Sequence, residues 1–190
     1  DQIIMGVGEL ILEISGAATG LLYVWLEIRH RRSMWVVGIV MSLCYIVVFG
    51  VEGLYASMGL YVYYLGMSLY GWVQWGRQQQ QGLRPLRITR RQAVMAGGLL
   101  VISFVVMWLV LKHLTDHPAP VPDAAIAALN ITATWLLIHS VLEQWLLLLV
   151  ANALAIGLYA HTGLWFTTGL YVVYFASSVA GYINWRRKIL

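Results

Sequence analysis

The sequence predicts an all-α integral membrane protein whose helices cross the bilayer several times. Hydrophobic residues make up 61% of the 190-residue chain and charged residues only 11%, whereas soluble domains contain about 45–50% and about 25%. The apolar residues also form long blocks, of the length that an α-helix needs to cross a hydrocarbon core about 30 Å thick. These observations exclude a separate soluble domain, so any function must lie among the helices.

The apolar blocks predict seven transmembrane helices joined by short loops. We expect them at residues 3–27, 34–51, 54–75, 92–112, 121–139, 143–160 and 163–185. A β-barrel would show segments of about ten residues with alternating polarity, and the apolar run from Trp145 to Ile156 does not alternate. An odd number of crossings places the two termini on opposite sides of the membrane.

The basic residues predict the orientation. Eleven of the twelve lie in the segments 29–32, 77–91 and 186–188, which seven crossings would place on one side, and Lys112 is the exception. Short loops rich in Lys and Arg favour the cytoplasm. We therefore expect a multi-pass protein of the bacterial inner membrane with its N-terminus outside and its C-terminus inside. Topology alone explains the net charge of +4, and no nucleic-acid partner is expected.

The sequence also contains an internal repeat. An offset of 110 aligns residues 35–75 with 145–185 without a gap, and thirteen of the 41 positions are identical. The matches include Gly, Tyr and Trp in register, which a merely apolar composition would not produce. Internal repeats of this kind are typical of transporters. A duplication that only stabilises a non-transporting protein is the alternative.

The repeat predicts three parts: a three-helix repeat at 1–76, a basic cytoplasmic loop with a linker helix at 77–120, and a second three-helix repeat at 121–190. The single linker crossing restores the direction of the chain, so the two triplets are parallel. A substrate site is then expected between them, near the middle of the membrane.

Uncharged hydrogen-bonding groups dominate the polar residues at membrane depth. Ser42 and Asn152 occupy the same position of the repeat, and an ionisable group such as Glu13 is costly there unless it faces a cavity or a partner. Aromatic faces beside amides suit a flat, cationic ligand, although helix packing is the alternative for each residue. The candidate substrate-binding residues are Glu13, Tyr61, Tyr64, Asn130, Asn152, Tyr171 and Tyr174.

Trp35, Trp72, Trp75, Trp145 and Trp185 fall near the inner boundary of the membrane, where we expect an interfacial aromatic belt.

Enzymatic chemistry finds little support in the sequence. His113, Asp116 and His117 have a spacing that metal sites use, but they lie in an outer loop and lack a further ligand of similar quality. Neither a glycine-flanked nucleophilic serine nor a phosphate-binding loop occurs. We expect no enzyme activity, catalytic residue, metal or cofactor.

The segments 13–26, 53–75 and 143–185 resemble the PnuC-type vitamin transporters, a family best known for nicotinamide riboside. The resemblance implies a bundle of three, one and three helices similar to that of the SWEET sugar transporters. It also implies facilitated diffusion of the vitamin, which a cytoplasmic kinase traps by phosphorylation. A homo-oligomer is expected as well.

Two departures from the family pattern bear on the substrate. Tyr61 stands where members commonly have a glutamine, and Ser57 where an aspartate is frequent. Replacing an amide by a phenol changes the polar contacts of a ligand, so thiamine remains an alternative to nicotinamide riboside. A facilitator of small sugars or other solutes is a further alternative. The neutral lining favours an unphosphorylated ligand in each case.

Overall fold

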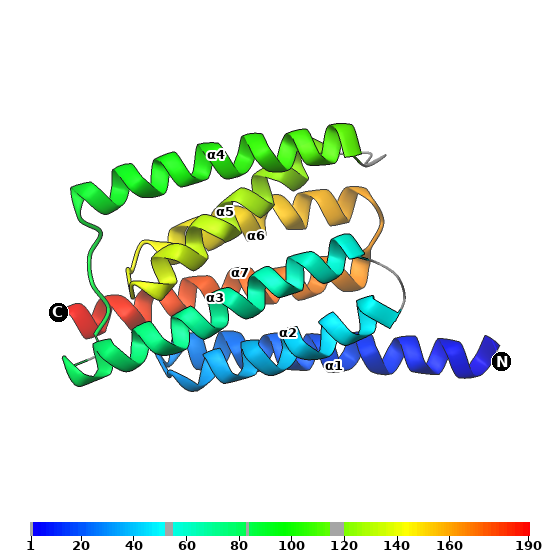
Figure 1. Cartoon of the computed structure of the whole chain (residues 1–190), viewed down its shortest axis with the longest axis horizontal. Coiled ribbons are helices and arrows are strands. Elements are labelled where there is room, and N and C mark those ends of the chain that lie inside the picture. Colours follow the sequence, from blue (N-terminus) through cyan, green and yellow to red (C-terminus); the bar gives the residue numbers. More distant parts are fainter. Residues whose placement is uncertain (1, 52–54, 83, 115–119) are drawn as a thin grey trace. The chain divides into compact units, whose positions relative to one another are not determined.

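The computed structural model describes the backbone of residues 2–51, 55–82, 84–114 and 120–190, and the side chains of 14–48, 50, 58–59, 61–82, 84–114 and 120–190. Over these ranges the chain forms seven α-helices (Figure 1). They are α1 (Gln2–Ile28), α2 (Ser33–Val51), α3 (Tyr55–Gln80), α4 (Arg90–Leu114), α5 (Pro120–Ile138), α6 (Gln144–His161) and α7 (Trp165–Ile189). The predicted all-α class is confirmed, and each expected apolar block is a helix.

The exposed surface of these helices is largely apolar. Within the described residues, α4 to α7 are long and apolar enough to cross a membrane, and α1 and α2 contain the shorter apolar segments Ile14–Ile28 and Ser33–Val48. On α4, Val94 and Ile102 are 70% and 65% exposed. Water would oppose so large an apolar surface, whereas hydrocarbon accepts it. The structure is therefore that of a multi-pass membrane protein.

The helices form two compact units, residues 1–76 and 77–190. In the first unit α1 packs against α2, and tryptophan rings join α2 to α3. The Trp35 and Trp75 rings meet edge to face, with centroids 5.6 Å apart and planes at 88°. A Cβ atom on Gly71 would lie 2.6 Å from the Trp35 ring, so this ring occupies the place of the missing side chain.

The second unit repeats this arrangement at an offset of 110 residues. The Trp145 and Trp185 rings lie 5.5 Å apart at 89°, and a Cβ atom on Gly181 would lie 2.5 Å from the Trp145 ring. The identities that stood out in the sequence thus occupy the same local geometry in both units.

The expected interfacial belt is wrong for four of its five tryptophans. Trp35, Trp75, Trp145 and Trp185 are at most 1% exposed. The rings of Trp35 and Trp145 fill the space over Gly71 and Gly181, and Trp75 and Trp185 pack edge to face against these two rings. Trp72 is half-buried, and the Arg32 guanidinium lies over its ring, 3.8 Å from the centroid.

In the second unit α5 packs against both α4 and α6, and α6 packs against α7. Buried positions on opposite sides of α5 carry small residues, among them Ala124, Ala128 and Ala133, which are almost fully buried. Small side chains let neighbouring helices approach closely in a membrane, so α5 can pack between α4 and α6.

The chain between α3 and α4 is attached to the turn between α5 and α6. The Leu86 N–H donates to the Ser140 carbonyl at 2.8 Å, and the Leu142 N–H donates to the Leu86 carbonyl at 2.8 Å. Gln78, in the last turn of α3, donates from Nε2 to the Ile138 carbonyl and accepts from the Ser140 hydroxyl at 2.7 Å. These bonds make a two-residue β-like bridge in an otherwise helical unit.

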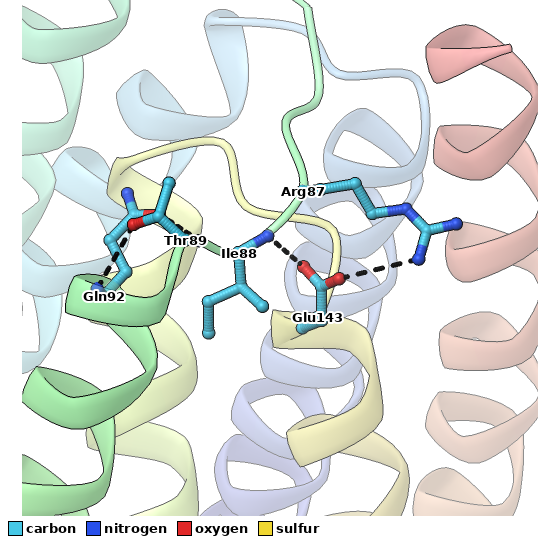
Figure 2. Close-up of polar contacts among 5 residues, drawn as sticks. All are labelled: Arg87, Ile88, Thr89, Gln92 and Glu143. Atoms are coloured by element: carbon cyan, nitrogen blue, oxygen red, sulfur yellow. Dashed lines mark hydrogen bonds and ion pairs between the residues drawn. The ribbon is translucent and has the colours of Figure 1, made fainter.

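Glu143 fixes the start of α4 in the same place (Figure 2). Its Oε2 atom accepts a hydrogen bond from the Ile88 N–H at 2.9 Å, and its Oε1 atom lies 4.0 Å from the Arg87 guanidinium. Thr89 then begins the helix, because its hydroxyl accepts from the Gln92 N–H while the Gln92 side chain accepts from the Thr89 N–H. This reciprocal pair is a capping box.

Filling the space over Gly181 should destabilise the second unit. We expect Gly181→Ala to lower the free energy of unfolding by about 1–3 kcal/mol, the usual effect of overpacking. Gly157→Ala is the matched control, since a Cβ atom there meets nothing within 4 Å and alanine favours a helix. Thermal unfolding in detergent measures both, and equal midpoints for the two variants would contradict the role given to the Trp145 contact.

Removing the carboxylate of Glu143 should loosen the chain before α4. A hydrogen bond to a charged group contributes about 1.5–3 kcal/mol, whereas an ion pair with an arginine that is 58% exposed contributes little. We therefore expect Glu143→Ala to accelerate hydrogen–deuterium exchange of the 84–89 segment. Glu143→Gln, which keeps an acceptor oxygen, should remain close to the parent protein. Similar acceleration in both variants would show that the ion pair dominates.

Candidate functional site

The first unit holds a group of tyrosines between α2 and α3. The Tyr61 ring stacks on the Tyr45 ring with centroids 4.7 Å apart and meets Tyr64 edge to face at 5.6 Å. Tyr64 also lies 5.7 Å from Tyr63. Tyr61 and Tyr64 come together because they are three residues apart on one helix face. Both are half-buried.

One helical turn or more from these rings, two serines are buried within the same unit. Ser42 of α2 is 2% exposed and Ser68 of α3 is 6% exposed. A Cβ atom on Gly38 would lie 2.8 Å from the Ser68 hydroxyl, so α2 and α3 approach closely at this level.

The second unit holds the corresponding tyrosines. Tyr171 lies 5.2 Å from Tyr159 and meets Tyr174 edge to face at 5.6 Å and 87°. The Tyr61 and Tyr64 rings have the same separation, at 74°. The helix spacing thus produces the same pair of rings in each unit.

Asn152 is the buried amide of the second unit. It is 7% exposed, and its Nδ2 atom donates to the Ser178 hydroxyl at 3.1 Å. Ser178 donates in turn to the Tyr174 carbonyl at 2.9 Å. This chain of hydrogen bonds ties α6 to α7 below the tyrosine pair. It uses one of the two amide N–H groups, and an amide has further donor and acceptor capacity.

Asn130 is bound within its own helix. Its Nδ2 atom donates to the Ile126 carbonyl at 2.8 Å, and Thr132 and Thr134 donate to the carbonyls of Ala128 and Asn130 in the same way. Asn130 is half-buried, and the hydrogen bond of its side chain stays within α5.

The remaining predicted residue, Glu13, has a side chain outside the described residues. Asp116 and His117 also lie outside them. Sequence reasoning missed two other polar residues at the end of α1, Glu27 and His30, which are 3% and 8% exposed. Glu27 is the last residue of the first expected helix, and His30 lies among Arg29, Arg31 and Arg32 in the basic segment that follows. A left-handed turn at His30, with φ of 56°, instead places its ring 4.5 Å from that of Trp75.

These features define a class of protein: an α-helical, multi-pass membrane protein with neutral aromatic and amide groups held inside its units. The comparison with protein families identifies it further. Residues 10–187 match the family model of the nicotinamide mononucleotide transporters, and the chain belongs to this family. The predicted membership in the PnuC-type transporters is confirmed.

Two relatives illustrate the similarity. The nicotinamide riboside transporter PnuC of Neisseria mucosa is 29% identical over 91% of this chain and 71% of its own length. The protein of the same name from Escherichia coli is 24% identical over 85% of this chain and 79% of its own.

A solved structure shares the fold. The crystal structure of the vitamin B3 transporter PnuC superimposes with a TM-score of 0.68, covering 99% of this chain and 89% of that one at 24% identity. This similarity supports the helical architecture.

Proposed function

We propose that this chain imports nicotinamide riboside across the bacterial inner membrane by facilitated diffusion. The observation that carries the proposal is its membership in a family whose similar members are named nicotinamide riboside transporters. A cytoplasmic kinase that phosphorylates the riboside would keep it inside the cell, because the anionic phosphate of the product would not fit a path without basic residues. The activity is transport, without a catalytic residue or a cofactor of the protein.

The polar groups inside the units support an unphosphorylated ligand. The candidate residues that the structure describes, Tyr61, Tyr64, Asn130, Asn152, Tyr171 and Tyr174, carry uncharged hydrogen-bonding groups. A phosphate group would need basic residues in a low-dielectric region, since an unpaired charge there is costly. The pyridinium ring of the riboside can instead lie against tyrosine faces, which attract a cation by about 0.5–2 kcal/mol.

We assign the substrate-binding role to Tyr61, Tyr64, Asn152, Tyr171 and Tyr174. The tyrosine pairs supply aromatic walls, and Asn152 supplies an amide whose position is fixed by Ser178. Glu13 and Asn130 remain candidate ligand contacts from the sequence. The division into two three-helix repeats, 1–76 and 121–190, with a basic loop and a linker helix in 77–120, belongs to the same proposal. The equal geometry of the two tryptophan pairs supports a duplication.

The proposed orientation places the N-terminus outside and the C-terminus in the cytoplasm, on the basis of the arginine-rich segments. We also propose a homo-oligomer, in keeping with the exposed apolar faces of several helices.

Thiamine is a second candidate substrate because of Tyr61, which stands where an amide is common in the family. Uptake into vesicles that contain the purified protein separates the candidates. We expect saturable uptake of radiolabelled nicotinamide riboside and its exchange with unlabelled riboside, without uptake of nicotinamide mononucleotide. Preferential uptake of thiamine would change the assigned substrate to thiamine and leave the assigned binding residues in place. Sugar uptake that cationic vitamins do not inhibit would overturn both assignments.

Asn152 should contact the substrate in addition to holding Ser178. We expect Asn152→Ala to raise the concentration for half-maximal uptake about five-fold, which corresponds to a hydrogen bond of about 1 kcal/mol. Ser178→Ala removes the same side-chain hydrogen bond between α6 and α7 and should have a smaller effect. Equal effects of the two variants would assign Asn152 to packing only.

Tyr64→Phe should also weaken uptake, because it removes a hydroxyl from a half-buried ring. Tyr70→Phe is the matched control on the same helix, since Tyr70 is 49% exposed. Unchanged uptake in the Tyr64 variant would show that the hydroxyl does not contribute to transport and that only the ring contacts matter.

A further inference from the structure

A hollow opens on the surface of the second unit where α4 passes over α5 and α6. It has a volume of about 260 Å³. The α4 wall is made of small residues, Ala93, Ala96 and Gly97, and ends at Leu100, while Leu136 and Leu147 close the far side. Ala93 and Gly97 are exposed, so the hollow is open to the surroundings of the protein.

A second hollow of about 310 Å³ continues the first one along α4 and α5. The two share Leu100, and Phe104, Ala125 and Ala128 line the second hollow. Together they follow α4 from Ala93 to Phe104, which is about 16 Å at the rise of about 1.5 Å per residue. One leaflet of the hydrocarbon core is half of about 30 Å. The groove, defined here as these two hollows, therefore has the length of one acyl layer.

Arginines stand at the end of the groove where α4 begins. Arg87, Arg90 and Arg91 are exposed. Glu143 lies 4.0 Å from Arg87 and accepts from the Ile88 N–H, so it balances one of the three charges (Figure 2). The N-terminus of a helix adds a partial positive charge. An apolar groove thus ends at a site with an excess of positive charge.

We propose that the groove binds an anionic phospholipid from the leaflet that contains the start of α4, the cytoplasmic leaflet in the proposed orientation. One acyl chain lies along α4 over Ala93 and Gly97, and the phosphate lies against Arg90, which is three residues before Ala93 and therefore on the same face of the helix. Basic clusters beside grooves between transmembrane helices recognise anionic headgroups.

A second copy of the chain fits this surface less well than a lipid does. Two copies that met face to face through this end of α4 would bring their arginines together, whereas a phosphate neutralises them. The charge complementarity therefore selects the lipid as the occupant.

Gly97→Leu tests the acyl contact. A Cβ atom at Gly97 meets nothing within 4 Å, so a larger side chain would fill the groove without displacing protein atoms. Gly98→Leu is the matched control: a Cβ atom there also meets nothing within 4 Å, and Gly98 does not line either hollow. Both variants carry the same new side chain on the same helix.

Native mass spectrometry of the protein released from mixed micelles measures bound lipid directly. We expect the parent protein to retain phosphatidylglycerol at least five-fold more than phosphatidylcholine. Gly97→Leu should lose most of this retained lipid, and Gly98→Leu should keep it. Arg90→Gln should abolish the preference for the anionic lipid, and Arg91→Gln, on the opposite face of α4, should keep it.

Equal retention of the two lipids by the parent protein would overturn the proposal, and so would equal lipid loss in the two leucine variants. If Gly97→Leu changed the number of protein copies in the complex and left bound lipid unchanged, the groove would be an interface between chains. The readout does not involve transport, so its outcome is independent of the proposed substrate.

Discussion

A hydrocarbon layer offers no hydrogen-bond partner to a peptide group, and this constraint decides the architecture of the chain. Each peptide N–H and C=O that enters the layer must be paired within the protein, which an α-helix achieves inside a single segment. The long apolar blocks therefore become helices, and irregular backbone is left to the ends. One stretch of irregular backbone is paired without a helix. The β-like bridge between Leu86 and the α5–α6 turn pairs backbone N–H and C=O groups that lie outside the helices.

Once the helices are formed, the contacts between them depend on shape, because lipid is as apolar as the helix surfaces. In each unit, a tryptophan ring on one helix packs closely against a glycine on the next helix. Trp35 fills the space over Gly71, and Trp145 fills the space over Gly181. Each ring then meets a second tryptophan edge to face, the arrangement that the charge distribution of aromatic rings prefers. The repeated sequence has thus preserved pairs of partners, a large residue on one helix and a missing side chain on the next.

The distribution of charge divides the second unit by function. Neutral groups, such as Asn152 and the tyrosines of α7, lie within the helices, whereas Arg87, Arg90, Arg91 and Glu143 lie near the start of α4. A ligand at the proposed transport site would therefore meet hydroxyls, amides and ring faces. A ligand that stays in the membrane can meet guanidinium groups beside an apolar groove. The proposed transport site and the proposed lipid site differ in chemistry for this reason, and neither requires a charged group buried without a partner.

The sequence by itself determined the helices, the membrane location, the family and the pairs Tyr61–Tyr64 and Tyr171–Tyr174, because hydrophobicity and helix spacing are local properties. Only the tertiary structure decided which side chains are covered. It turned the expected tryptophan belt into buried packing, bound Asn130 within its own helix, and brought Asn152 to Ser178. It also buried Glu27 and His30, although both lie beside exposed basic residues in the sequence. Burial depends on what a neighbouring helix places opposite a residue, and that information is not contained in the residue's own segment.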